Sequence, residues 1–383
     1  MSAAVIDVRS AEDVRDVVHR TVQALAEGQL VAFPTETVYG VAASALDADA
    51  VKRLAEVKGR AADHPMALAV KSADEAFDYV PDISPLGRRL ARRCWPGPVT
   101  LVLGNNHPDS LIQRLPNQVH EFIIPRGTLG LRVPAHPLIL DVLQLMAGPL
   151  ALTSANLTGE PDAVSAEDVI QSLGDRIDLI LDDGRSQFAQ SSSVILVHDR
   201  QVNMLREGVV SEAAIKRLAR FLVLMVCTGN TCRSPMAELL MRRRLANHLG
   251  CQIDQLDEQG VQVMSAGIAA MPGGRPSIEA VNVMLERELD LSPHLSQPLS
   301  AHLVGHADLI LTMTQSHRDL VVNQLPEAEN RVRLLRADQG DISDPIGGSI
   351  DVYRQCADQI DAQIEIQIQQ MNLESLIGEF RSQ

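Results

Sequence analysis

The chain has 383 residues, about twice the length of a typical domain, so two domains are expected. Hydrophobic residues make up 45% of the chain and charged residues 22%, which excludes a disordered protein, and the net charge of −15 argues against a broad basic surface for nucleic acid. No apolar run approaches the ~20 residues needed to span a bilayer, the start lacks the layout of a signal peptide, and five scattered cysteines do not make a secreted disulfide framework. We therefore expect a soluble, cytoplasmic protein with no membrane partner.

The first half alternates helix-like and strand-like segments. A helix is expected over 11–28, opened by Ser10 with Asp13 as its partner in a capping box, and a short strand follows at 30–33. Further helices are expected at 48–58, 84–94, 136–147 and 165–173, and further strands at 66–70, 99–103, 129–133, 150–152, 177–181 and 193–198. Because several connections are too short for helical crossovers, this pattern predicts an α/β domain with a mixed sheet.

A helix at about 211–219 runs into an apolar strand without a linker, so the boundary is expected between two domains spanning 1–219 and 220–383. The second domain repeats strand and helix: strands are expected at 221–226, 261–265, 308–312 and 331–335, and helices at 234–249, 276–288, 314–324 and 349–372. This βαβ series predicts a doubly wound parallel sheet.

The first strand and helix of the second domain enclose a loop that carries a thiol. Residues 227–235 read Cys-Thr-Gly-Asn-Thr-Cys-Arg-Ser-Pro. Successive backbone N–H groups of such a loop point inward and bind an anion, and the helix N-terminus adds positive potential. We expect Ser234 to cap the helix, Pro235 to lie in its first turn and Arg233 to grip two phosphate oxygens. The same field favours Cys227 as a thiolate nucleophile.

A general acid for the leaving group is expected from Asp344, far downstream in a glycine-bounded loop, where Pro345 forces an extended conformation. The alternative is that Cys227 is a buried structural cysteine and Asp344 an ordinary turn residue. The residues expected to line the phosphate are Thr228, Gly229, Asn230, Thr231, Cys232 and Ser234.

These residues resemble the low-molecular-weight protein phosphatase family over nearly all of 221–375, with matching segments at 226–238, 265–267, 307–313 and 343–349. The resemblance implies a phosphorylated protein as substrate, a phosphocysteine on Cys227, phosphate held by Arg233, and Asp344 as acid and then base. It also implies that Ser234 stabilises the thiolate and that Asn230 orders the loop.

The choice of substrate depends on two positions in that resemblance. Thr231 matches the protein-arginine phosphatases of the family, whereas its tyrosine phosphatases usually carry an aliphatic residue there, and Ile346 stands where they have tyrosine. Phosphoarginine is therefore favoured, with phosphotyrosine as the alternative.

Arsenate reductase chemistry on this fold needs a matched pair of resolving cysteines that the chain lacks. Cys232 either forms a reversible disulfide with Cys227 or packs beneath the loop.

Hydroxyl residues and separated cations follow several predicted strands of the first domain, at 34–40, 58–60, 130–134, 153–156 and 205–208. Such groups suit an acidic polyanion such as ATP. Taken singly, Lys58 or Arg60 reads equally well as a solvated helix end, and Thr35 or Thr37 as a turn hydroxyl.

In this order the segments resemble the threonylcarbamoyl-AMP synthase family across roughly 5–220. The resemblance implies condensation of L-threonine, bicarbonate and ATP, with Mg²⁺, into threonylcarbamoyl-AMP and pyrophosphate, which serves tRNA modification with partner proteins. Its implied threonine-binding residues are Thr37, Arg132 and Ser192. Its implied ATP-binding residues are Lys58, Arg60, His64, Thr128, Ser154, Asn156 and Arg206.

The sequence therefore predicts a bifunctional enzyme, a nucleotidyltransferase fused to a cysteine-dependent phosphatase, without a protein-held metal centre. The alternative for the first domain is a catalytically silent RNA-binding module fused to a tyrosine phosphatase. Its acidic charge weighs against that module and against stable direct binding of tRNA.

Overall fold

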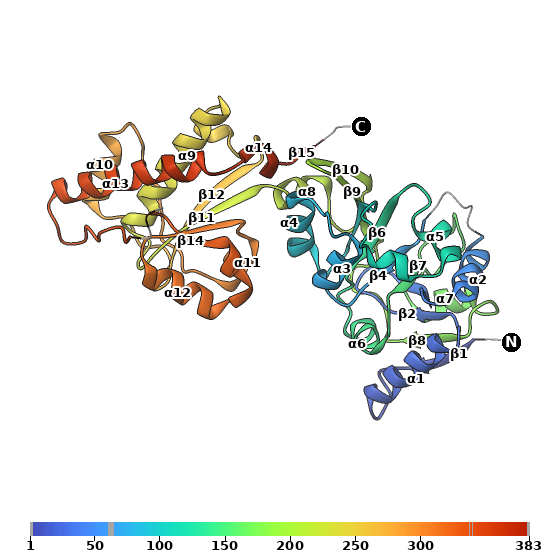
Figure 1. The fold of residues 1–383 in the computed structure, drawn as a ribbon. Coiled ribbons are helices and arrows are strands. Elements are labelled where there is room, and N and C mark those ends of the chain that lie inside the picture. The colour runs from blue at the N-terminus through green and yellow to red at the C-terminus, as the bar shows by residue number, and fades with distance from the viewer. Residues whose placement is uncertain (1–2, 60–64, 337, 339, 381–383) are drawn as a thin grey trace. The chain divides into compact units, whose positions relative to one another are not determined.

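The computed structural model describes residues 3–59, 65–336, 338 and 340–380 (Figure 1). By its internal contacts the chain divides into two units, residues 1–218 with the chain end from Phe380, and Ala219–Glu379. Within the described ranges no helix is long and apolar enough to cross a membrane.

The first unit contains helices and strands in alternation. Its helices are α1 (Val14–Ala26), α2 (Ala48–Lys58), α3 (Ala73–Tyr79), α4 (Pro85–Cys94), α5 (Asn117–Ile123), α6 (Pro137–Leu145), α7 (Ala166–Leu173) and α8 (Glu212–Leu218). Its strands are β1 (Ala4–Asp7), β2 (Val31–Phe33), β3 (Gly40–Ser44), β4 (Ala67–Ala69), β5 (Val99–Gly104), β6 (Thr128–Arg132), β7 (Leu150–Ser154), β8 (Leu179–Asp182), β9 (Ser193–His198) and β10 (Gln201–Arg206). The two-residue strand β15 (Glu379–Phe380) falls on the division between the two units.

Among the described residues these strands form one sheet in the order β1-β8-β2-β3-β7-β4-β6-β5-β9-β10-β15. Strand pairs such as β5–β9 are parallel, whereas β3–β7 and β5–β6 are antiparallel. The predicted α/β domain with mixed strand directions is confirmed. The sheet is continuous because β3 and β10, which the sequence pattern did not predict, pair with β7 and β9.

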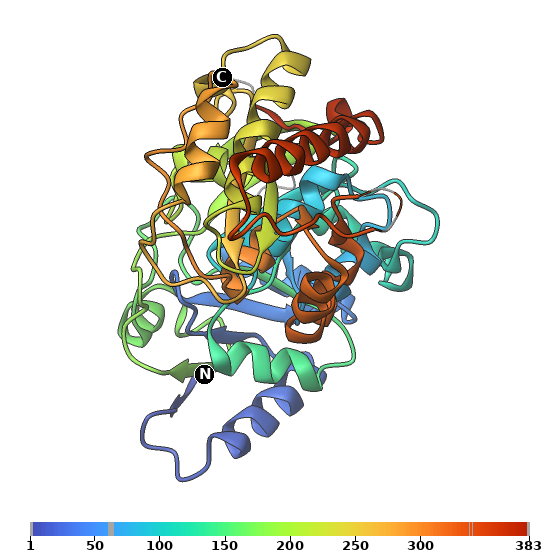
Figure 2. The ribbon, with the colours of Figure 1, turned by 90° about the vertical axis from the view of Figure 1, so that its left-hand side faces the viewer.

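Helices α1 and α6 lie side by side against one face of this sheet (Figures 1 and 2). Their apolar residues, such as Val18 and Ile139, are buried with Ala42 and Leu152 of the sheet. The start of α1 corrects one expectation. Its N-cap is Asp13, whose carboxylate accepts from the Arg15 amide, because the chain enters the helix only at Val14.

The second unit is a parallel α/β layer. Its strands are β11 (Phe221–Cys227), β12 (Val261–Gly267), β13 (Leu309–Thr312) and β14 (Val332–Leu334). Its helices are α9 (Arg233–Leu249), α10 (Ile278–Leu285), α11 (Ala301–His306), α12 (Gln315–Gln324), α13 (Ile350–Gln369) and α14 (Leu373–Leu376). The sheet has the order β12-β11-β13-β14, and each neighbouring pair is parallel.

Strand β11 is buried along its whole length and separates two apolar cores. Val223 and Met225 belong to the core beneath α9, α10 and α13, whereas Leu222 and Leu224 belong to the core beneath α11 and α12. Alternate residues of a strand point to opposite faces, so helices cover both faces (Figure 1). The predicted doubly wound parallel sheet is confirmed, and it places the end of β11 at the C-terminal edge of the sheet, where ligands bind in such folds.

Candidate active sites

The thiol loop joins the end of β11 to the start of α9 and is held by backbone hydrogen bonds from the segment after β12. The amides of Ile268 and Ala269 donate to the carbonyls of Cys227 and Thr228, at 3.0 and 2.9 Å. The amide of Ser277 donates to the Thr231 carbonyl at 3.0 Å. These bonds engage the carbonyls of Cys227, Thr228 and Thr231 on the outside of the loop.

The sulfur of Cys227 is buried and has two polar neighbours. The backbone N–H of Asn230 donates to Cys227 Sγ at 3.2 Å, and Ser234 Oγ lies 3.0 Å from the same sulfur. The chain can therefore hold a nucleophilic sulfur at this point.

The expectation that Ser234 caps α9 is wrong. Helix α9 begins at Arg233, and its N-cap residue Cys232 makes no side-chain cap bond. Because the loop turns into the helix one residue earlier than expected, Ser234 lies inside the first turn. Its hydroxyl therefore faces the Cys227 sulfur and has no exposed surface.

Asn230 holds the loop in shape from its centre. Its backbone has φ of 55°, in the left-handed region that asparagine tolerates better than most residues. Its side-chain amide donates to Ser234 Oγ at 2.9 Å and to Ser265 Oγ at 2.8 Å, and its carbonyl accepts from the Gln297 amide at 2.9 Å. The residue is fully buried, so these bonds form away from water.

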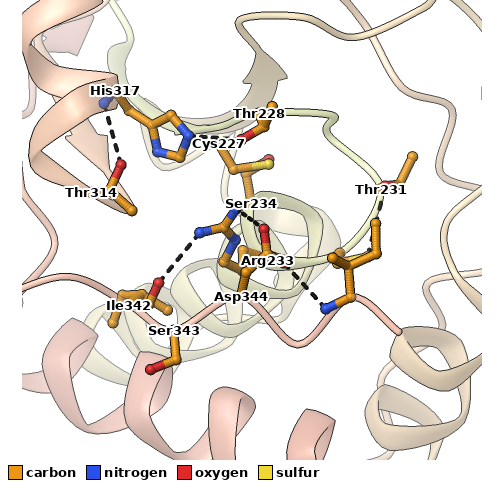
Figure 3. A network of polar contacts seen from close by, with 12 residues as sticks. Cys227, Thr228, Thr231, Arg233, Ser234, Thr314, His317, Ile342, Ser343 and Asp344 are labelled. Carbon is orange, nitrogen blue, oxygen red and sulfur yellow. Dashed lines mark hydrogen bonds and ion pairs between the residues drawn. The ribbon is translucent and has the colours of Figure 1, made fainter. Parts of the chain in front are cut away.

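Arg233 and Asp344 meet at the open side of the loop (Figure 3). Arg233 is 6% exposed, forms an ion pair with Asp344 and donates to the Ile342 carbonyl at 3.3 Å. The Asp344 side chain stays 43% exposed, and its other oxygen accepts from the Ile346 amide at 3.2 Å. The structure thus brings Asp344, which is distant in the sequence, to the loop that carries Cys227 and Arg233.

Two polar contacts near the loop were not predicted. His317 of α12 lies with Nε2 2.9 Å from Thr228 Oγ1. Ser265 donates to Glu238 at 2.7 Å, and burial raises the pKa of that carboxyl. Glu238 and Ser265 lie in the segments 226–238 and 265–267 that match the phosphatase family, whereas no local pattern identifies His317, which only the fold brings to the loop.

Cys232 faces away from the nucleophile in this structure. Its thiol donates to Ser277 Oγ at 3.3 Å and lies 3.6 Å from the Tyr353 hydroxyl. Within the described part of the chain all five cysteines are free. Burial raises the pKa of Cys356, whose thiol donates to a loop carbonyl, to about 12. The packing alternative for Cys232 fits these contacts, and the disulfide stays a prediction.

A separate pocket of about 350 Å³ lies in the first unit. Small residues such as Gly40, Ala67 and Gly130 form part of its lining, which leaves room above the sheet. Its polar lining comes from strand ends and the segments after them: Thr35, Thr100, Arg126, Thr128, Arg132, Thr153, Ser154, Ser191, Ser192 and Arg206.

One side of the pocket is built around Arg132. Its guanidinium donates to Glu36 at 2.7 Å and to Thr37 Oγ1 at 2.9 Å, and Glu36 also accepts from the Ala135 amide at 3.0 Å. Arg132 is buried, and its Nε has no hydrogen-bond partner among the described residues. The arrangement presents a fixed cationic donor to the pocket and suits a small carboxylate.

A second cation, Arg206, lies at the end of β10. It donates to the Ser192 carbonyl at 2.8 and 3.0 Å and to Ser192 Oγ at 3.0 Å. Burial lowers the pKa of Arg206, with Asp162 opposing and Arg132 adding to that effect. The pocket therefore carries Arg206 and Arg126 beside the Arg132–Glu36 ion pair, and these cations suit an anionic ligand.

Lys58 lies beneath the pocket rather than in its lining. It is 1% exposed, and its ammonium donates to the Ser154 carbonyl at 2.7 Å, to Asn156 Oδ1 at 2.9 Å and to the Asn156 carbonyl. Ser154 Oγ in turn donates to Asn156 Oδ1 at 2.6 Å. One ammonium therefore ties the turn after β7 together.

Among the residues predicted for this domain, Thr128, Arg132, Ser154, Ser192 and Arg206 line the pocket. Thr37, Lys58 and Asn156 contact those residues from behind, whereas Arg60 and His64 lie outside the described residues. The sequence reasoning missed Glu36 and Arg126. Glu36 stands in the same strand-end segment as Thr37, which was the signal available for it.

Neither site offers an evident metal centre. Within the described part of the chain no group of three or more His, Cys, Asp or Glu is placed to hold a metal ion. The described lining of the pocket also contains no carboxylate. A divalent cation there has to be held mainly by a phosphate-bearing ligand and water.

Two family models match the chain. The model Sua5_yciO_yrdC, described as "Telomere recombination", matches residues 23–208, and the model of low molecular weight phosphotyrosine protein phosphatase matches 222–375.

Named relatives follow the same division. A threonylcarbamoyl-AMP synthase of Pyrococcus abyssi is 40% identical over 184 residues, 48% of this chain and 51% of that protein. A relative in Mycobacterium tuberculosis, named provisionally for the same activity, is 35% identical over 51% of this chain and 85% of its own length. A protein-arginine-phosphatase of Bacillus subtilis is 38% identical over 36% of this chain and 89% of its own length.

The chain spans about half the length of the first curated relatives it matches. Among solved structures, a variant of P. abyssi Sua5 aligns with a TM-score of 0.51 and 24% identity, covering 87% of this chain and 98% of that one. That likeness concerns the fold alone.

Proposed function

The chain belongs to the Sua5/YciO/YrdC family in its first half and to the low molecular weight phosphotyrosine protein phosphatase family in its second, and from that premise we propose that it is a bifunctional enzyme. Residues 1–219 act as a threonylcarbamoyl-AMP synthase and residues 220–383 as a cysteine-dependent protein phosphatase.

The phosphatase proposal is carried by one observation: Cys227 Sγ lies in an N–H-lined loop beside Arg233, which pairs with Asp344. The thiolate attacks phosphorus, and Arg233 holds two of its oxygens. Asp344 gives a proton to the leaving nitrogen or oxygen as the bond to phosphorus breaks. The same carboxylate then takes a proton from the water that hydrolyses the phosphocysteine, which restores both groups.

We assign phosphoarginine as the substrate. The proposal is supported by Thr231 in the loop, by Ile346 after Asp344-Pro345, and by the protein-arginine-phosphatase among the relatives. Ile346 is 69% exposed and offers no ring for stacking a phenol.

The test compares phosphoarginine and phosphotyrosine peptides, with Cys227→Ser as the blank and Thr231→Ile as the specificity variant. We expect wild type to prefer phosphoarginine and Thr231→Ile to shift the ratio of kcat/KM toward phosphotyrosine. A preference for phosphotyrosine in wild type contradicts the substrate assignment but not the mechanism. Turnover unchanged by Cys227→Ser contradicts the phosphatase proposal itself.

The synthase proposal is carried by the pocket that Arg132 and Arg206 line, of which Arg132 is buried. Arg132, with Thr37 beside it, binds the carboxylate of L-threonine, and Ser192 completes that subsite. Thr128, Ser154 and Arg206 bind ATP, while Lys58 and Asn156 hold the turn that carries Ser154. Arg60 and His64 complete the predicted ATP site.

The reaction needs placement rather than a protein nucleophile. The threonine amine adds to bicarbonate and water leaves, which gives a carbamate. A carbamate oxygen then attacks the α-phosphorus of ATP, pyrophosphate leaves and threonylcarbamoyl-AMP is formed. The chain offers Mg²⁺ no carboxylate ligands at the described pocket, so no step is assigned to it. The product serves tRNA modification, with transfer to tRNA left to partner proteins.

Pyrophosphate release from ATP tests this proposal. We expect release to require both L-threonine and bicarbonate and to fall at least ~100-fold in Arg206→Ala, because a charged hydrogen-bonding group at the phosphates is lost. The matched control is Arg20→Ala, since Arg20 lies on α1 outside the pocket lining. Release that does not depend on threonine contradicts the synthase proposal.

A further inference from the structure

We propose that His317 is a positioning residue of the phosphatase site, which holds the Thr228 hydroxyl so that its proton points to a phosphoryl oxygen bound in the loop. The proposal rests on the phosphatase function proposed above and adds a side-chain donor to the backbone cradle. It also assigns a purpose to a buried imidazole that the reaction steps leave unused.

The contact is direct and joins a buried histidine to an exposed threonine. His317 Nε2 lies 2.9 Å from Thr228 Oγ1, and the histidine is 6% exposed. Figure 3 shows the imidazole on the same side of the loop as the side chains of Cys227 and Arg233, with the Thr228 hydroxyl facing it. Thr228 follows the nucleophile directly in the chain, so its hydroxyl lies at the border of the anion site.

The other ring nitrogen decides which atom carries the proton. Nδ1 of His317 is buried and has no hydrogen-bond partner among the described residues. A buried N–H without an acceptor is rarer and costlier than a lone pair without a donor. The neutral ring therefore carries its proton on Nε2 and donates to Thr228 Oγ1. The hydroxyl proton of Thr228 is then free for another acceptor.

Burial disfavours the charged form of the ring. Burial lowers the pKa of His317, and Arg233 lowers it further, while Asp341 and Asp344 act in the opposite direction. Thr314, whose hydroxyl accepts from the His317 amide at 3.3 Å, fixes the start of α12 beneath the ring. The imidazole is thus a fixed, uncharged donor rather than a second cation beside Arg233.

This geometry has a consequence for the reaction. A hydroxyl that accepts from His317 can donate to the phosphoryl group in the substrate complex and in the transition state. A hydrogen bond to a charged oxygen contributes enough that its loss lowers the rate by about 10-fold to 100-fold. His317 acts only through Thr228, so removing both partners lowers the rate no more than removing the hydroxyl.

A double-mutant cycle tests this with kcat/KM on a phosphoarginine peptide and with inorganic phosphate as competitive inhibitor. The variants are Thr228→Val, which keeps the shape of the side chain, His317→Leu, and the pair. Thr228→Ser and His317→Gln are the matched controls. Serine keeps the hydroxyl that Thr228→Val removes, and glutamine keeps an N–H donor that His317→Leu removes. Cys227→Ser gives the blank.

We expect Thr228→Val and His317→Leu each to lower kcat/KM by about 10-fold or more and to weaken phosphate inhibition, while the pair falls no further than Thr228→Val. Thr228→Ser and His317→Gln should recover most of the loss. Multiplicative losses in the pair, or a Gln variant no better than the Leu variant, overturn the proposal. If His317→Leu does not fold, the inhibition of Thr228→Val by inorganic phosphate decides alone. Inhibition unchanged from wild type overturns the proposal. Activity that survives Cys227→Ser contradicts the phosphatase function instead.

Discussion

Gly267 ends β12 directly beneath the thiol loop, and replacing it with alanine should distort the phosphate cradle. A Cβ at this position would lie 2.6 Å from the Thr228 carbonyl oxygen and 2.8 Å from the Asn230 nitrogen. Both are backbone atoms of the loop, so neither can turn aside as a side chain could. The loop or the end of β12 has to move by about half an ångström to relieve the overlap.

The expected cost follows from that displacement. Overpacking of a close-packed interior costs about 1–3 kcal/mol, and a displacement of this size at a reacting centre should lower kcat by about 10-fold to 100-fold. In Gly267→Ala the amides of the second unit should therefore exchange hydrogen faster than in wild type. The kcat on a phosphoarginine peptide should fall. Gly305→Ala in α11 is the matched control, since its Cβ meets nothing within 4 Å. Wild-type kcat in Gly267→Ala would refute the reasoning.

Three further changes probe other parts of the chain. Glu36→Gln leaves Arg132 without its buried counter-charge. We therefore expect the free energy of unfolding of the first unit to fall by about 3 kcal/mol and the KM for threonine to rise. Unfolding is followed by the fluorescence of Trp95, the only tryptophan in the sequence, and an unchanged unfolding curve would contradict the prediction. Lys58→Met leaves three buried oxygen acceptors without their shared donor, and pyrophosphate release should fall with a matching loss of stability. Burial raises the pKa of the Glu238 carboxyl. Its protonated form therefore contributes fully to stability below the ordinary carboxyl pKa, and this contribution is lost as the pH rises through the raised pKa. In Glu238→Gln the stability of the second unit, measured by hydrogen exchange between pH 4 and pH 7.5, should depend less on pH.

The sequence predicts the thiol loop well because its chemistry is contiguous. Cys227 and Arg233 stand at the two ends of one loop, and the strand and helix that flank it have clear periodicity. The position of Ser234 was predicted wrongly, since the turn of the loop and not the residue's capping preference decides where α9 begins. Ser234 therefore came to lie beside the sulfur rather than at the helix end.

The partners of the loop could not be predicted from local sequence. His317 and Gln297 reach it from separate elements, and nothing in their neighbours distinguishes them from surface residues. Strand β3 was missed for a related reason. Its sequence, Gly-Val-Ala-Ala-Ser, has weak strand preference, and it is extended because β2 and β7 pair with it on both sides.

The first unit shows the same limit at Lys58. A lysine at the end of a helix before glycine reads as a solvated cation, yet its ammonium is buried among oxygens of the turn after β7. Arg132 was predicted as a binding residue, whereas its ion pair with Glu36 depends on two segments far apart in the chain. Burial of charge is decided by tertiary packing.

We propose that one chain carries two active sites that work independently. The most direct test measures pyrophosphate release and phosphoarginine hydrolysis in the same preparations of full-length wild type, Cys227→Ser and Arg206→Ala. We expect Cys227→Ser to lose only the hydrolysis and Arg206→Ala to lose only threonine-dependent pyrophosphate release. Loss of both activities in either folded variant, or hydrolysis that persists in Cys227→Ser, would contradict it.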